Sequence, residues 1–170
     1  MRKLTVLLLV CACALVAPAA ASDRARAEDQ LERSLLAEIN ELRARHGLGP
    51  LRSSARLAAA AGSHSRAMVA GGFFAHASSD GTSFWKRVRR WYGSRGYAYW
   101  AVGENLLWAS PSVAPEQALQ MWLASPPHRK ILLTPKWEEI GLAAVHAPVA
   151  PGAFEGLEVT VITADFGVRR

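Results

Sequence analysis

Cysteine is nearly absent from this sequence of 170 residues, and its position restricts what the chain can do. Both cysteines, Cys11 and Cys13, lie in the apolar run between Leu4 and Val16. The rest of the chain therefore has no cysteine with which to form a disulfide or to hold a metal through thiolates. No internal repeat is visible, and the length suits one domain with no room for a second.

The N-terminus has the features of a secretory signal peptide over residues 1–21. Two basic residues precede the apolar run, and the three alanines at 19–21 are typical of a cleavage site. The run is too short for a membrane-spanning helix with stop-transfer flanks. A lipoprotein is the less favoured alternative, because Val10 is bulky where a lipidation site at Cys11 needs a small residue. The sequence predicts a secreted or periplasmic protein that is not an integral membrane protein.

Hydrophobic periodicity predicts helices first and strands near the end. Residues 22–30 are polar and without periodicity, so we expect a short tether before a domain at residues 31–168. The segments expected to be helical are 31–46, 55–70, 84–91 and 115–124. The segment 97–108 is expected to be extended or irregular, and 139–146 and 157–166 are expected to pair as an antiparallel hairpin.

Positive charge exceeds negative charge, with a formal net charge of +6, and basic residues are densest near residues 86–95. The short helix predicted there has an apolar side formed by Phe84, Val88 and Trp91. Its other side is basic and comprises Lys86, Arg87, Arg89 and Arg90. A solvated helix surface is the default interpretation, and contact with an anionic polymer or with lipid headgroups is the alternative. Nothing matches a nucleic-acid-binding module, so no nucleic acid is expected as a partner.

Three side chains suited to chemistry lie beside glycines, prolines or helix ends. His76 follows an aromatic pair, Glu104 lies within Gly-Glu-Asn, and His128 follows a double proline. Ser125 can cap the helix that begins at these prolines, which would fix the direction in which His128 leaves the backbone. Two imidazoles and a carboxylate suit a divalent metal such as zinc, or an acid–base pair in a cleft. A rigid network in which Glu104 binds both histidines, with no chemistry, is an equal alternative.

Two further interpretations concern residues that resemble catalytic groups. His64 lies on the apolar side of the second predicted helix, where a buried and hydrogen-bonded histidine is more common than a ligand. A triad of Ser125, His128 and Glu104 is disfavoured, because the serine is explained as a helix cap and no nucleophile elbow surrounds it.

Seven short motifs follow one another over residues 31–167. They are Asn40-Glu41-Leu42-Arg43, His64-Ser65 with Met68, Phe73-Phe74-Ala75-His76, Gly103-Glu104-Asn105-Leu106, Trp122 with Ser125-Pro126-Pro127-His128-Arg129, Ile140-Gly141 and Phe166-Gly167. In this order they resemble the CAP superfamily, also called SCP-like, of cysteine-rich secretory proteins, antigen 5 and pathogenesis-related proteins. The chain is most similar to the bacterial members.

The resemblance implies an α+β fold: a three-layer α-β-α sandwich with a small antiparallel sheet flanked by helices. It also implies a cleft that holds two histidines and two acidic residues. His76, Glu104 and His128 match three of these four positions, and Ser125 stands where animal and plant relatives have a glutamate. The implied cleft is therefore partial and comprises His76, Glu104, His128 and Ser125.

The resulting expectation is an exported CAP domain that acts as a binding or interaction module of the cell envelope or medium. Its partner would be an anionic envelope component, a peptide or a lipid. One alternative is a metal-dependent hydrolase of peptide or envelope material, with His76 and His128 as zinc ligands and Glu104 as third ligand or general base. Glu104 is the only candidate for a catalytic residue. Lipid or sterol binding by the aromatic residues at 91–100 is the other alternative.

Overall fold

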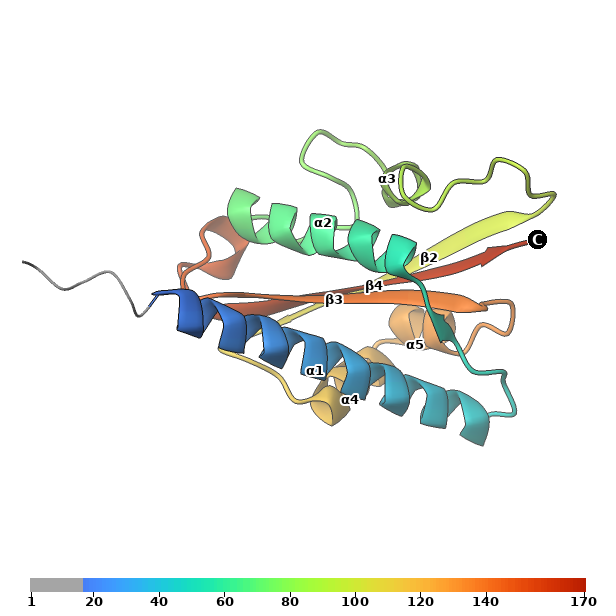
Figure 1. Cartoon of the computed structure of the whole chain (residues 1–170), viewed down its shortest axis with the longest axis horizontal. Helices are drawn as coiled ribbons and strands as arrows, with labels where there is room; N and C mark the ends of the chain where they lie inside the picture. The colour runs from blue at the N-terminus through green and yellow to red at the C-terminus, as the bar shows by residue number, and fades with distance from the viewer. Residues whose placement is uncertain (1–16) are drawn as a thin grey trace, which may run out of the picture.

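The computed structural model describes residues 17–170, which form a four-stranded sheet with helices on both faces (Figure 1). The elements in chain order are α1 (Ala17–Arg45), β1 (Arg52–Ser53), α2 (Ala55–Gly71), α3 (Phe84–Arg89), β2 (Trp100–Ala109), α4 (Pro115–Ala124), α5 (Pro126–Leu132), β3 (Glu139–Ala147), the 3-10 helix η1 (Gly152–Phe154) and β4 (Val159–Arg169). Most of the predicted signal peptide, with both cysteines, lies outside the described residues. Among residues 17–170, no helix combines the length and the hydrophobicity needed to cross a membrane.

The strand order is β1-β3-β4-β2, which places β2 at one edge of the sheet. The predicted hairpin is confirmed, because β3 and β4 pair antiparallel, and β4 also pairs antiparallel with β2. The segment 97–108, expected to be extended or irregular, contributes β2. The sheet is mixed rather than purely antiparallel, since the two-residue β1 pairs parallel with the start of β3.

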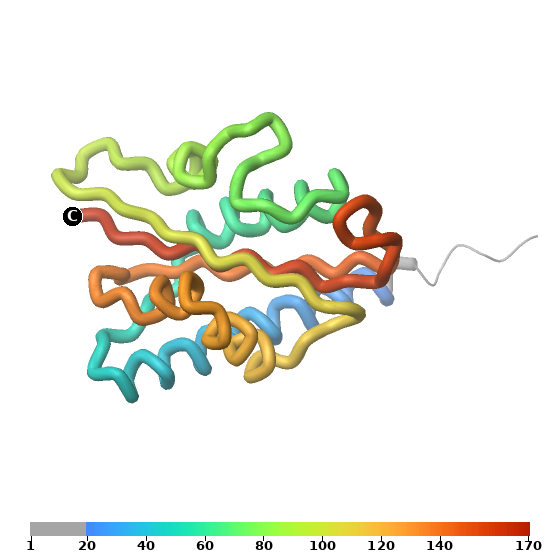
Figure 2. Tube along the Cα trace, turned by 180° about the vertical axis from the view of Figure 1, so that it is seen from behind, coloured from blue at the N-terminus to red at the C-terminus, as the bar shows by residue number. Residues whose placement is uncertain are grey.

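Helices α1, α4 and α5 cover one face of the sheet, and α2 and α3 cover the other, as Figures 1 and 2 show from opposite sides. The predicted three-layer α-β-α sandwich is therefore confirmed. Because both faces are covered, β4 is buried along nearly all of its length. The alternation of apolar and polar residues in β4 does not mark a solvent-facing side, and Thr160, Thr163 and Asp165 are all buried.

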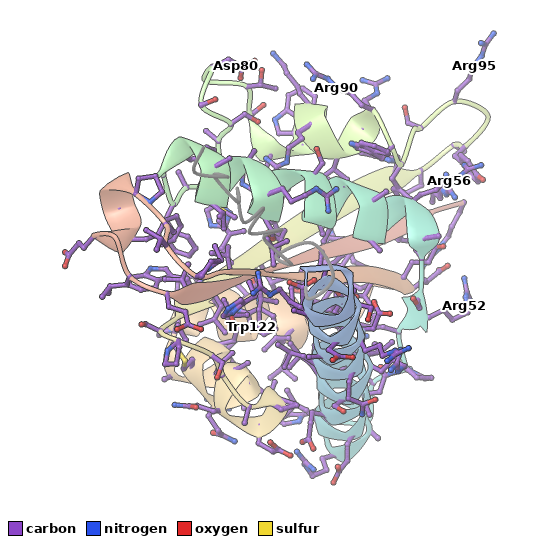
Figure 3. The ribbon with its side chains drawn as sticks, turned by 60° about the vertical axis from the view of Figure 1, so that its left-hand side comes forward. Arg52, Arg56, Asp80, Arg90, Arg95 and Trp122 are labelled. Atoms are coloured by element: carbon purple, nitrogen blue, oxygen red, sulfur yellow. The ribbon has the colours of Figure 1, made fainter. Side chains whose placement is uncertain are left out.

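Trp122 anchors α4 in the largest of the three hydrophobic clusters of the described residues, between the sheet and the layer of α1, α4 and α5 (Figure 3). Its ring is 1% exposed, and its indole N–H donates to the backbone carbonyl of Leu106 in β2 over 3.0 Å. On the opposite face, α2 lies almost directly on β3. A Cβ atom at Gly141 would lie 2.0 Å from the backbone nitrogen of Ala58, so only glycine fits at this crossing. Glycine at position 141 therefore permits the close approach of α2 to β3.

The prediction of a tether at residues 22–30 is wrong, because these residues are part of α1. The reason lies at the edge of β3, where β1 pairs only with Glu139 and Ile140. Further along β3, the carboxylate of Glu32 accepts the backbone N–H of Ala144 over 2.9 Å, and that of Glu28 accepts the N–H of His146 over 2.8 Å. These carboxylates satisfy amides for which no strand is available, which holds a polar helical segment against the sheet.

Candidate functional site

The double proline separates α4 from α5 as the sequence predicts. Ser125 lies at the N-cap position between the two helices, with a φ of −99° and a ψ of 112°. Its hydroxyl makes no capping hydrogen bond, which differs from the expected role of the side chain. Its backbone carbonyl accepts the N–H of Arg129 over 2.9 Å. Proline geometry and this first backbone bond therefore set the direction of α5, whose first turns carry the half-buried His128.

The motif Gly103-Glu104-Asn105 on β2 connects the two helical layers. Successive side chains of a strand point to opposite faces of the sheet. Accordingly, Glu104 meets His76 and α3 on one side, and the Asn105 amide donates to the backbone carbonyl of His128 on α5 over 3.1 Å. A Cβ atom at Gly103 would lie 2.8 Å from the ring of Trp137, so glycine allows the close packing beneath this site. Each position of the motif thus has its own physical role.

Glu104 holds the ring of His76 at the surface. Its carboxylate is 1% exposed, and Oε1 lies 2.8 Å from Nδ1 of His76, whose side chain is 52% exposed. A carboxylate accepts hydrogen bonds, so Nδ1 is the donor, and within residues 17–170 no hydrogen bond engages Nε2. The other oxygen, Oε2, pairs with the guanidinium of Arg87, which also donates to the backbone carbonyl of His76 over 2.9 Å. Arg87 therefore fixes both the carboxylate and the loop that carries the histidine.

A second carboxyl group lies next to Glu104. Asp165 on β4 is directly opposite Glu104 in the antiparallel register, so both side chains point to the same face. Asp165 is fully buried, and neither of its oxygens has a hydrogen-bond partner within the described part of the chain. Burial raises the pKa of Asp165 well above its ordinary value, the negative charge of Glu104 raises it further, and Arg87 opposes the shift. One cation and two carboxyl groups thus share the interior, which favours a neutral Asp165.

His128 lies near His76 and beside a groove. Burial lowers the pKa of His128, and the charge of His76 lowers it further, which favours a neutral imidazole at His128. The groove has a volume of about 280 Å³ and is lined by Phe74, Leu106, Leu107, Trp108, Met121, Trp122, Ser125 and His128. The structure therefore brings His76, Glu104, His128 and Ser125 to one region at the β2 edge of the sheet, with an apolar surface beside them.

The arrangement restricts the chemistry available to Glu104. Both of its oxygens are occupied by His76 and Arg87, and no hydrogen bond joins Glu104 to His128 among residues 17–170. In the same part of the chain, no group of three His, Cys, Asp or Glu side chains is placed to hold a metal ion. Glu104 as a third zinc ligand does not fit this geometry. Zinc binding by His76 and His128 alone stays a prediction.

No hydrogen bond joins Ser125 to His128 in the described residues, so the geometry offers no support for a serine triad. The interpretation of His64 is confirmed by its burial. It is 1% exposed, and its Nε2 donates to the backbone carbonyl of Ala75 over 2.9 Å. It thus helps to fix the loop that precedes His76.

Sequence reasoning missed Arg87 and Asp165. The sequence places Arg87 on a basic solvated helix surface, but it is 6% exposed and forms an ion pair. Trp91, predicted on the apolar side, is 45% exposed instead, and Tyr92 is buried. α3 ends at Arg89, so the helical spacing does not extend to these aromatic residues. The signal for Asp165 was available, because a lone carboxylate within the apolar run of β4 is unusual in a covered strand.

Known proteins with similar sequences and structures agree with this architecture. The model of the CAP family, the cysteine-rich secretory protein family, matches residues 36–156. The uncharacterized protein YkwD of Bacillus subtilis (strain 168) is 29% identical over 116 residues, which are 68% of this chain and 43% of that protein.

Two solved structures are also similar. An extracellular protein containing a SCP domain from Bacillus anthracis str. Ames is 27% identical with a TM-score of 0.63, over 84% of this chain and 41% of that one. An outer surface protein of Borrelia burgdorferi shares the fold at 20% identity and a TM-score of 0.61, over 83% of this chain and 94% of that one. The chain spans less than half the length of the two Bacillus relatives. With the family model matching most of its residues, the chain belongs to the CAP, or cysteine-rich secretory protein, family.

Proposed function

We propose that this CAP domain is an extracytoplasmic binding module that holds an extended, largely apolar peptide across the cleft between His76 and His128. One observation carries the proposal: the exposed ring of His76 is fixed at Nδ1 by a buried carboxylate whose charge is balanced by Arg87. This arrangement presents Nε2 to solvent in one orientation, which lowers the entropy lost when a ligand binds. The descriptions of the relatives as extracellular and outer surface proteins support a site outside the cytoplasm.

The groove beside His128 supports a peptide as the ligand. Phe74 and Met121 are 36% and 40% exposed, so an apolar side chain placed there would remove hydrophobic surface from water. His128 and Ser125 border the same groove and can exchange hydrogen bonds with a peptide backbone. A lipid tail would gain nothing from these polar groups, which makes lipid or sterol binding the weaker candidate.

The same geometry argues for binding over hydrolysis. A general base must reach the proton that it removes. The carboxylate of Glu104 is almost fully buried, and both of its oxygens are engaged. A hydrolytic reaction would need Glu104 to leave Arg87, and that step would leave a buried cation without its paired carboxylate.

The test uses the peptide acetyl-Leu-Leu-Leu-amide and NMR of the histidine rings. We expect saturable shifts of the His128 and His76 resonances, with weaker binding in Met121→Ala and His128→Ala. Val149→Ala is the matched control, because Val149 is 68% exposed and lies outside the groove. Mass spectrometry of the same samples should show the peptide intact.

Three results would contradict the proposal. Cleavage of the peptide that disappears in Glu104→Gln would establish the hydrolase alternative. Binding that is equally strong in all the variants would place the peptide outside the cleft. Absence of any shift at millimolar peptide would exclude peptide binding of this kind.

A further inference from the structure

A second pocket lies in the α2–α3 layer and shares no lining residue with the groove of His128. Its volume is about 450 Å³, and its polar and aromatic lining includes Ser63, His64, Ser79, Asp80, Arg90 and Trp91. Asp80 and Arg90 both lie at the outer surface of this layer, on the side away from α1 (Figure 3). The pocket is therefore open to solvent and combines donors, acceptors and one large ring.

The pocket contains hydrogen-bond acceptors as well as donors. His64 donates from Nε2 to the backbone of Ala75, so its Nδ1 is an acceptor, for which the described residues provide no partner. Burial and the nearby Arg87 lower the pKa of His64, which keeps the ring neutral. The carboxylate of Asp80 is held by the backbone N–H of Thr82 over 2.8 Å and is a second acceptor.

The cationic groups of the pocket have unused donors. Arg90 is exposed, and its guanidinium has neither an ion pair nor a hydrogen bond among the described residues, although its positive charge helps to lower the pKa of Asp80. Arg87 also lines the pocket, and its Nε is buried without a partner in the described chain, although the rest of the guanidinium is bound to Glu104 and His76. A buried donor without a partner indicates a place where a ligand or water completes the hydrogen bonding.

The charge of this layer favours an anionic ligand. Residues 46–103 contain eight lysines or arginines and one acidic residue, Asp80. Arg56, Arg90 and Arg95 project from the same side of the molecule (Figure 3). A surface with this imbalance attracts anions and repels cations. Asp80 nevertheless lies within the pocket, and a compact anion such as phosphate would be repelled by its carboxylate.

We propose that this pocket binds a pyranose unit that carries a carboxylate. Trp91, 45% exposed, offers a flat apolar surface for the C–H groups on one face of the sugar ring. Arg90 pairs with the carboxylate, and Asp80 and the serines exchange hydrogen bonds with the ring hydroxyls. A neutral sugar would offer Arg90 hydroxyl acceptors but no negative charge with which to form an ion pair. The pocket shares no lining residue with the groove of His128, so this proposal does not rest on peptide binding in the cleft.

The experiment compares methyl β-D-glucuronide with methyl β-D-glucoside, followed by the NMR signal of the Trp91 indole N–H. We expect the glucuronide to bind at least about tenfold more tightly than the neutral glucoside. Arg90→Gln should abolish that preference, and Trp91→Ala should weaken the binding of both sugars. Because Trp91→Ala lacks the indole signal, its binding is followed by the backbone amide shifts of the protein.

The controls lie on α3, directly before these two residues. Arg89→Gln and Trp85→Ala change an exposed arginine and an exposed tryptophan that do not line the pocket, and neither should alter binding. Because Arg90 and Trp91 are themselves exposed, their variants should keep the wild-type fold, which the dispersion of the NMR spectrum checks. His128→Ala should bind the glucuronide like the wild type, so failure of the cleft proposal does not affect this result.

Several outcomes would overturn the assignment. Absence of binding by either sugar at millimolar concentration would exclude it. Equal affinity for the two sugars would exclude the pairing of Arg90 with a carboxylate. Displacement of the glucuronide by equimolar inorganic phosphate would show a general anion site, and binding unchanged in both Arg90→Gln and Trp91→Ala would place the sugar elsewhere.

Discussion

Replacement of Asp165 by asparagine tests whether the carboxyl group beside Glu104 is uncharged in the folded protein. Asp165 is fully buried, and its oxygens have no hydrogen-bond partner among the described residues. Arg87 already pairs with Glu104, so a second negative charge would lack a cation of its own. Asparagine has nearly the same shape as a protonated aspartate and cannot ionise. The substitution therefore removes the titration while changing the packing little.

The expected effect depends on pH in a defined direction. In the unfolded chain an aspartate titrates near pH ~3.9, and in the folded protein burial and Glu104 raise the pKa of Asp165. Between these two values the folded state keeps a proton that the unfolded state has lost. The stability that Asp165 contributes is thus complete below about pH 4 and is lost as pH rises toward the folded pKa. The loss is about 1.4 kcal/mol for each pH unit.

Urea unfolding at several pH values measures this directly. Between about pH 4 and the folded pKa of Asp165, we expect the free energy of unfolding of Asp165→Asn to rise relative to the wild type by about 1.4 kcal/mol per pH unit. The control is Asp80→Asn, an exposed site where the backbone N–H of Thr82 lowers the pKa of the carboxyl. Stability from that site is lost as pH falls, so its pH dependence should have the opposite sign.

The reasoning fails if Asp165 is ionised and stabilises Arg87. Asp165→Asn would then show no relative gain with rising pH, and at neutral pH it would lose several kcal/mol, as expected when one partner of a buried pair is removed.

Three other substitutions test the packing and electrostatics of the site. Arg87→Gln should lower the free energy of unfolding by about 3–5 kcal/mol, because it leaves Glu104 buried without its cation. Arg89→Gln, a control on the exposed side of α3, should change the free energy of unfolding by less than about 0.5 kcal/mol. Urea unfolding measures both variants. In an NMR titration, His128 should titrate below ~6.5, and His76→Ala should raise its pKa because a neighbouring charge is removed; an unchanged value would contradict their proximity. Gly141→Ala should destabilise by about 3 kcal/mol in thermal or urea unfolding, because the added Cβ meets the backbone of α2.

The family motifs were sufficient to predict the sandwich and to place His76 and Glu104 together. The local sequence pattern did not reveal Arg87 and Asp165, the buried residues that lie next to Glu104. Arg87 lies among basic neighbours in a helix of six residues, which is too short for periodicity to show which side is buried. Arg87 is buried because it contacts the carboxylate of Glu104, 17 residues further along the chain. Asp165 was missed because the prediction of a hairpin at 157–166 does not specify which of its side chains are buried, whereas helices cover both faces of the sheet.

The start of α1 was missed for a similar reason. Its polar first turns have no apolar periodicity, and they are held by backbone amides of β3 that lie 112 and 118 residues further along the chain. Propensity and periodicity describe neighbours in sequence, so they do not register a helix whose stabilising partners belong to a distant sheet edge.

The buried cluster of Arg87, Glu104 and Asp165 also bears on the choice between a binding site and a purely structural network. Buried ion pairs contribute little net stability, and apolar residues of similar volume often serve a core as well or better. A network that served stability alone would be expected to end in buried partners. Here it ends at His76, whose side chain is 52% exposed and gains little from burial. What the cluster supplies is a fixed orientation for one solvent-facing imidazole, which is what the proposed binding role requires of His76.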